Sequence, residues 1–186
     1  KMACLTHCML SDKYPMPKIN KAWKDIMFNQ FHDILCGCSI KSAYEDAAYL
    51  HGETMTIAQE VTNFACQRMS WRIDTIGGSE YEATKGGKNY TLWMQDSIGT
   101  PMVLFNPLSW DITVPVQLRT EITGLRDSNR NDIPYQIVRA ERSNNNDQTD
   151  SVFMAKIPAM GYSVYHMFLN GDKKEYTNTL TANNYL

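Results

Sequence analysis

Hydrophobic residues recur at helical spacing through the first third of the chain and at alternate positions through its second half. In the first third, one apolar stripe is formed by Ile19, Ala22, Trp23, Ile26 and Met27. The pattern predicts helices over residues 1–10, 18–31 and 39–71, separated at 11–17 by a connection containing two prolines. Three helices joined by short links predict a three-helix bundle.

The third predicted helix is long, and its N-terminus has two candidate caps. Ser39 is one, and Ser42, three residues before Glu45, fits a capping box. Its expected inner face consists of Ala43, Ala47, Leu50, Thr54, Ile57, Val61, Phe64 and Met69. The methionines of the helical part are expected to fill its core, because Met adapts to irregular gaps.

The rhythm changes after residue 73. Paired glycines interrupt residues 73–99, which predicts a linker with one candidate strand at 90–94. Period-two runs then predict antiparallel strands at 102–106, 112–118, 135–140, 151–157 and 163–169. Pro115 should lie on an edge strand or at a bulge, because proline cannot donate a hydrogen bond to a neighbouring strand.

Together these elements predict a multi-part α+β chain. We expect a helical bundle over residues 1–74, a linker over 75–100, and an antiparallel β-sandwich over 101–186. The sandwich is expected to be incomplete, because the tail after residue 171 has few residues suited to a core. The chain opens within a predicted helix, so we expect it to be a fragment of a longer polypeptide.

Composition and charge exclude several classes. The chain has 186 residues, 20% of them charged, and a net charge of −2. The sequence has no basic face that would indicate a nucleic-acid partner, and it has no apolar run long enough for a membrane span. No signal-peptide pattern precedes the first helix. We therefore expect neither nucleic acid nor a membrane among its partners.

Five cysteines all lie within the first 66 residues. An odd number in a helical region argues against a disulfide scaffold and favours reduced thiols, which suggests an intracellular location. Cys4, Cys8, Cys36 and Cys38 could alternatively form a structural zinc knot, although Cys-x-Cys spacing is poor for one.

Candidate chemistry concentrates at His32-Asp33, where the second helical pattern ends. An imidazole and a carboxylate lie side by side there, and Gly37 supplies a turn with positive φ. The dipeptide alone is a weak signal, because a metal or catalytic site needs several convergent groups. The other histidines, His7, His51 and His166, stand alone in sequence and are expected to be structural or surface residues.

The sequence around His32-Asp33 is more specific than the dipeptide itself. Residues 23–40, and most specifically Asn29-Gln30-Phe31-His32-Asp33-Ile34-Leu35, resemble glycoside hydrolase family 38, the zinc-dependent α-mannosidases, in its microbial and cytosolic branch. Two later stretches agree in order. Residues 103–110 resemble the strand that opens the family's β-sandwich region, and 157–162 resemble its Val-Pro-Ala-Leu-Gly-Tyr turn.

The resemblance implies roles for two residues. His32 would be one zinc ligand, and Asp33 would contact a sugar hydroxyl of a mannose-containing glycan. The family's nucleophilic aspartate and its His-x-Asp pair have no counterpart here, so no catalytic residue is expected within this segment. They would belong to an upstream catalytic barrel of the same polypeptide. Zn²⁺ would be bound by the intact enzyme and not held tightly by this fragment, which alone should be inactive.

One departure from the family pattern concerns the turn. Cys36-Gly37-Cys38 stands where the family has Pro-Gly-Ser, so a looser turn carrying two thiols is expected. Two other functions remain open from the residues themselves. One is a non-catalytic carbohydrate-binding or scaffolding module, and the other is a thiol-based metal or redox protein.

Overall fold

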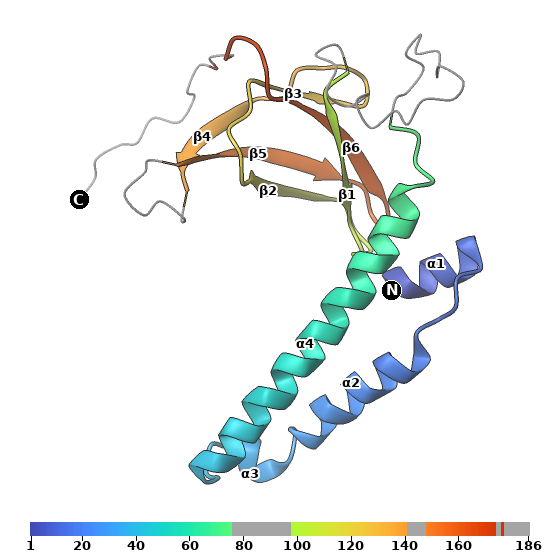
Figure 1. Ribbon diagram of the computed structural model, residues 1–186, viewed down its shortest axis with the longest axis vertical. Helices are drawn as coiled ribbons and strands as arrows, with labels where there is room; N and C mark the ends of the chain where they lie inside the picture. The colour runs from blue at the N-terminus through green and yellow to red at the C-terminus, as the bar shows by residue number, and fades with distance from the viewer. Residues whose placement is uncertain (76–97, 141–147, 174–175, 177–186) are drawn as a thin grey trace. The chain divides into compact units, whose positions relative to one another are not determined.

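The computed structural model of the protein describes residues 1–75, 98–140, 148–173 and 176 (Figure 1). The chain divides into two compact units, Lys1–Ile73 and Asp74–Leu186. The first is helical and the second contains two small antiparallel sheets, which confirms the predicted α+β class. Among the described helices, none combines the length and the apolar character that a bilayer crossing requires.

The helical unit contains four helices within its described residues. They are α1 (Met2–Leu10), α2 (Met16–Phe28), α3 (His32–Leu35) and α4 (Lys41–Ser70). The structure therefore has four helices where a three-helix bundle was predicted, and the second does not reach residue 31. Helix α2 ends at Phe28, and His32 begins a separate short helix. Asn29 is the C-cap of α2: its amide still bonds to the carbonyl of Asp25, and its side chain donates to the carbonyl of Ala47 in α4, which fixes the end of the helix there.

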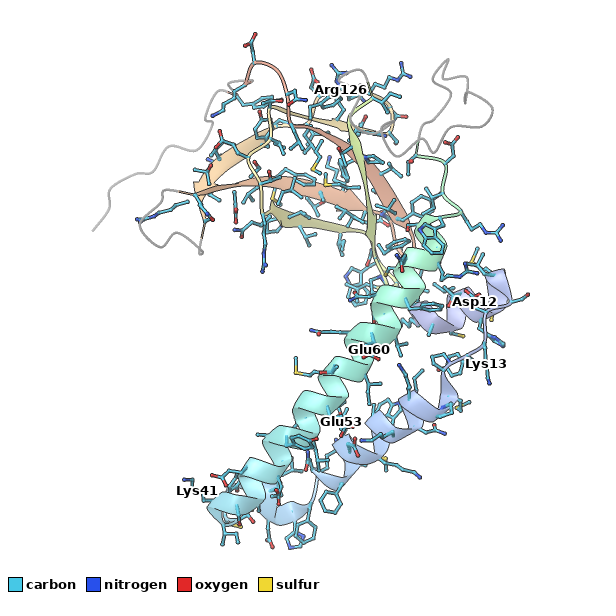
Figure 2. All side chains as sticks on the ribbon, in the orientation of Figure 1. Asp12, Lys13, Lys41, Glu53, Glu60 and Arg126 are labelled. Atoms are coloured by element: carbon cyan, nitrogen blue, oxygen red, sulfur yellow. The ribbon has the colours of Figure 1, made fainter. Side chains whose placement is uncertain are left out.

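Helix α4 is the long element against which the other helices pack. Helix α2 lies alongside it in the antiparallel direction (Figure 1), as Lys21–Glu53 and Lys18–Glu60 ion pairs of 2.7 Å show. At the far end, Arg68 of α4 donates two hydrogen bonds of 2.9 Å to Asp12, which follows α1. Figure 2 shows Asp12, Glu60, Glu53 and Lys41 in that order along this unit.

The predicted apolar faces of α2 and α4 are in contact but only partly buried, and Ile19, Ala22 and Ile26 of the α2 stripe are half-buried. No residue of α2 is buried, and Trp23 and Met27 of its apolar stripe are exposed. In α4, Ala47 and Thr54 are buried as predicted, but Phe64 is exposed and its neighbour Ala65 is buried instead. Of the methionines expected in the core, Met2 is buried, whereas Met9, Met27 and Met55 are exposed.

The start of α4 also differs from the prediction. Ile40 is its N-cap, and no side chain caps the helix. Neither Ser39 nor Ser42 therefore plays the predicted capping role. The amide of Ser39 instead donates to the hydroxyl of Tyr44, so a tyrosine one turn into α4 holds the segment that leads into it.

The second unit contains six described strands in two three-stranded sheets (Figure 1). They are β1 (Thr100–Phe105), β2 (Ile112–Leu118), β3 (Gly124–Asp127), β4 (Tyr135–Arg139), β5 (Thr149–Ile157) and β6 (Tyr162–Phe168). One sheet has the order β1-β6-β3 and the other β2-β5-β4, with antiparallel pairing throughout.

Five of these strands correspond to predicted runs, and β3 was not predicted because its four residues are too few to show period two. Pro115 lies on β2, an edge strand of its sheet, as expected. The candidate strand at 90–94 lies outside the described residues.

A single core joins the two sheets. Leu125 of β3 and Tyr165 of β6 pack with Phe153 and Ala155 of β5, and the rings of Phe153 and Tyr165 are 5.1 Å apart. Strand β5 alternates buried and exposed side chains from Phe153 to Ile157, as a strand with one face in a core must. This core has the architecture of the predicted sandwich.

Candidate functional site

The candidate site lies on α3, between the end of α2 and the start of α4. Asn29 sets its position: its side chain is only 4% exposed and donates a hydrogen bond of 3.2 Å to the carbonyl of Ala47 in α4. The amide of Asn29 bonds to the carbonyl of Asp25, which closes the last turn of α2. The chain therefore leaves α2 at a fixed point on α4, and α3 starts three residues later.

His32 is the first residue of α3 and is open to solvent. Its side chain is 77% exposed, and its Nε2 lies 3.2 Å from Oδ1 of Asp33. The ring of Phe31 lies 4.2 Å from the imidazole, centroid to centroid, which limits the orientations available to it. An imidazole that contacts a carboxylate and keeps an exposed face has the donor chemistry of a metal ligand.

The turn after α3 brings two thiols together. Gly37 has φ of 79°, in the region that glycine adopts without steric cost, as predicted. Sγ of Cys36 lies 3.0 Å from Sγ of Cys38, and the latter lies 3.7 Å from Oδ1 of Asp33. The hydrogen bond shared between the thiols lowers the pKa of Cys36 and raises that of Cys38.

Tyr44 holds this turn against α4. Its hydroxyl accepts a hydrogen bond of 3.2 Å from the amide of Ser39 and lies 3.3 Å from the carbonyl oxygen of Asp33. It also lies 3.4 Å from the carbonyl oxygen of Ile34. The backbone on both sides of the Cys36-Gly37-Cys38 turn is thereby tied to one side chain of a long helix.

Six large apolar side chains between residues 23 and 40 are each more than half exposed. They are Trp23, Met27, Phe28, Phe31, Leu35 and Ile40. We call these six residues the apolar rim. Single exposed apolar residues are ordinary, but six in one short stretch of sequence mark a segment that is suited to contact with another protein surface.

The remaining histidines and cysteines do not join the site. His7 Nδ1 and His166 Nε2 each lie within hydrogen-bond distance of a backbone carbonyl oxygen, at 2.7 and 2.6 Å. Cys4 and Cys8 lie on α1, which packs with α4 at the end opposite α3. The alternative of a four-cysteine zinc knot is therefore wrong, and the one group of potential metal donors in the described residues is Asp33, Cys36 and Cys38.

Comparison with known protein families gives a match for the helical unit. The family described as "Alpha mannosidase middle domain" matches residues 2–69, from the start of α1 to the last turn of α4. Residues 2–69 form an alpha-mannosidase middle domain. His32, Asp33 and the turn that follows them all lie within this middle domain.

Similarity also extends beyond the middle domain. Alpha-mannosidase G of Dictyostelium discoideum is 21% identical over 162 residues, which is 87% of this chain and 14% of that protein. The crystal structure of an alpha-mannosidase from Enterococcus faecalis V583 has the same fold, with a TM-score of 0.63 and 16% identity over 98% of this chain. The chain covers 23% of that structure, so it spans less than a quarter of either relative.

The three sequence stretches that resemble the family have two different structural settings. Residues 103–110 and 157–162 contact each other in the second unit: the amide of Asn106 donates to the carbonyl of Gly161, and the amide of Met160 donates to that of Leu108. Both stretches are therefore explained by the fold. The stretch 29–35 buries the side chain of Asn29 and leaves that of His32 exposed, so the fold explains the asparagine but not the histidine.

The sequence did not indicate Tyr44 as part of this region. A tyrosine in the first turns of a predicted helix carries no signal of its own, because its partners are backbone groups that become close only in the folded chain. The role of Asn29 had a signal, since asparagine is a frequent residue at helix ends, but its bond to Ala47 depends on tertiary packing.

Proposed function

We propose that this chain is part of a zinc-dependent, retaining α-mannosidase of glycoside hydrolase family 38 that hydrolyses terminal α-mannosides. In this proposal, His32 is one zinc ligand and Asp33 contacts a hydroxyl of the bound mannose. The observation that carries it is the exposed His32–Asp33 pair inside the alpha-mannosidase middle domain. Both residues belong to the stretch that the fold itself leaves unexplained.

The donor chemistry at α3 fits a shared zinc site. Zn²⁺ binds neutral imidazole nitrogen and carboxylate oxygen, and catalytic sites take about three protein ligands. This segment offers one exposed imidazole, and its neighbouring carboxylate can orient the ring, as partners of ligating histidines commonly do. The remaining ligands, the nucleophile and the acid/base carboxylate would come from an upstream catalytic barrel of the same polypeptide.

When bound, the zinc ion would supply Lewis acidity and a fixed point of attachment for sugar hydroxyls. The contribution of this chain is to position His32 and Asp33. Asn29 and Tyr44 fix α3 on α4, so His32 and Asp33 are presented from a rigid base, as an active site requires. The apolar rim would be covered by the barrel, which would bury it and exclude water from the sugar site.

The test uses the longer protein that contains these residues. His32→Ala should lower both the zinc content and kcat/KM for an aryl α-mannoside, because it removes one ligand. Asp33→Asn should keep the zinc ion bound by His32 and reduce kcat/KM by at least about tenfold, the effect expected from loss of a charged hydrogen bond to substrate.

His51→Ala is the matched control, because His51 is an exposed histidine of α4 outside the site. It should leave zinc content and activity unchanged. A zinc content in His32→Ala equal to that of wild type would contradict the proposed role of this residue. The 186-residue chain alone should release no mannose, since it carries neither of the two carboxylates that retaining hydrolysis needs.

A further inference from the structure

We propose that Asp33, Cys36 and Cys38 form a binding site for a soft, thiophilic divalent cation, separate from the zinc role proposed for His32. One potential ligand atom from each of these residues lies within 4.8 Å of the other two. Thiolates select soft metal ions, and a carboxylate oxygen completes a mixed set of three protein ligands. No other group of three such donors occurs in the part of the chain that the structure describes.

The spacing of the donors suits one tetrahedral ion. Two sulfur atoms bound at about 2.3 Å to one tetrahedral ion lie roughly 3.8 Å apart, and a sulfur and an oxygen lie roughly 3.6 Å apart. Sγ of Cys38 is already 3.7 Å from Oδ1 of Asp33. The two sulfur atoms, now 3.0 Å apart, need to separate by less than about 1 Å, which rotation of either exposed cysteine side chain allows.

The backbone of the site is held in place before any ion binds. The amide of Cys36 bonds to the carbonyl of His32 at 3.2 Å, and that of Gly37 bonds to the carbonyl of Ile34 at 3.2 Å. Tyr44 then ties Asp33 and Ser39 together across the turn. Binding would therefore fix three side chains and little backbone, which keeps the entropic cost small.

Access to the site is open from solvent. Both cysteines are exposed, and no heavy atom beyond the adjacent residues lies within 4 Å of the position that a Cβ would take on Gly37. Gly37 thus allows the turn to bring the sulfur atoms together without covering them. A fourth ligand could be a water molecule, as in zinc sites with three protein ligands.

Cadmium is the probe for this site. We would titrate Cd²⁺ anaerobically into the 186-residue chain carrying Cys4→Ser, Cys8→Ser and Cys66→Ala, and follow thiolate-to-cadmium charge-transfer absorption. The expected result is one ion per chain. Adding Asp33→Asn should weaken binding by at least about tenfold, because it removes a charged ligand.

A second comparison uses the otherwise unmodified chain, in case the triple variant does not fold. Cys36→Ser/Cys38→Ser should abolish the tight charge-transfer signal, whereas Cys4→Ser/Cys8→Ser should retain it. The latter pair is a matched control, because these two exposed cysteines lie one turn apart on α1.

Three results would overturn the proposal. The first is that Cys4→Ser/Cys8→Ser abolishes the charge-transfer signal and Cys36→Ser/Cys38→Ser does not. The second is that Asp33→Asn leaves the cadmium affinity unchanged, and the third is that one ion binds per two chains. The readout is metal–thiolate bonding in this chain alone, so failure here leaves the proposed mannosidase function untouched. Conversely, full zinc occupancy in His32→Ala of the longer protein would not affect this site.

Discussion

The two units of the chain differ in what they do with their hydrophobic residues. The second unit buries Leu125, Phe153 and Tyr165 in a core that joins both sheets. The helical unit buries mainly small residues, such as Ala47, Thr54 and Ala65 of α4, and exposes the six large side chains of the apolar rim. Helices α2 and α4 are joined partly by exposed ion pairs, which contribute little to stability.

The same contrast separates the sequence stretches that resemble the family. Asn106 is buried and its side chain serves only the fold, whereas His32 is exposed and serves no visible structural purpose. A structural residue is satisfied within its own unit. A residue that a unit holds rigidly but leaves open is a candidate for contact with something else, and the predictions that follow test this distinction.

The largest effect is expected from opening the core of the second unit. Phe153→Ala should destabilise that unit by about 3–5 kcal/mol, because Phe153 is 2% exposed and its ring packs against that of Tyr165. Urea unfolding followed by near-ultraviolet circular dichroism of tyrosine would measure it. Met154→Ala, at the exposed neighbouring position, should cost less than about 0.5 kcal/mol. Equal losses would show that β5 does not alternate as described.

A smaller loss is expected at Asn106. Its Nδ2 donates to the carbonyls of Trp110 at 2.8 Å and Pro158 at 3.0 Å, and its Oδ1 accepts from the amide of Leu108 at 2.9 Å. Asn106→Ala would remove these hydrogen bonds of a side chain that is only 2% exposed, at a cost of about 2 kcal/mol. The same urea experiment measures it, with Asn129→Ala in an exposed turn as control. An unchanged midpoint would refute the structural role of this residue.

The helical unit should respond to pH through Asp12. Its hydrogen bond with Arg68 lowers the pKa of Asp12 below that of the unfolded chain. The pair therefore stabilises the unit fully above the unfolded pKa of about 3.9, and this stabilisation disappears as the pH falls through the folded pKa. The melting temperature, followed by helical circular dichroism, should be higher for wild type than for Asp12→Asn at neutral pH. The two melting temperatures should converge in acid. A difference independent of pH would contradict this.

The smallest effect on stability is expected at the apolar rim. Phe28→Ser and Phe31→Ser should each change the free energy of unfolding by less than about 0.5 kcal/mol, because both rings are exposed. They should nevertheless reduce binding of a hydrophobic dye such as ANS and reduce self-association in sedimentation experiments. A loss of stability like that of Phe153→Ala would show that these rings belong to a core.

The period-two strands were the most predictable part of the fold. Strand β2 was predicted at its observed bounds, because its polar and apolar residues alternate over seven positions. Strand β3 has only four residues, too few for a pattern. The start of helix α4 was predicted to within two residues, but its N-cap was not predicted correctly. The amide of Ser39 donates to the hydroxyl of Tyr44, a contact that sequence spacing does not indicate.

At the site, His32, Asp33 and the glycine turn were visible in the sequence, and the positive φ of Gly37 is confirmed. The sequence did not predict α3 as a separate helix, because the apolar periodicity of α2 continues past Asn29. The predicted apolar stripe of α2 is only partly buried: Ile19, Ala22 and Ile26 are half-buried, whereas Trp23 and Met27 are exposed. Periodicity identifies an apolar face, but it does not tell whether the partner of that face lies in the same unit.

The central claim, that the middle domain presents His32 as a metal ligand, is tested most directly by zinc-edge X-ray absorption on the longer protein. The spectrum reports how many imidazole ligands surround the ion. Wild type should show one imidazole more than His32→Ala, with His51→Ala identical to wild type. An equal number of imidazole ligands in wild type and His32→Ala, at full zinc occupancy, would contradict the account.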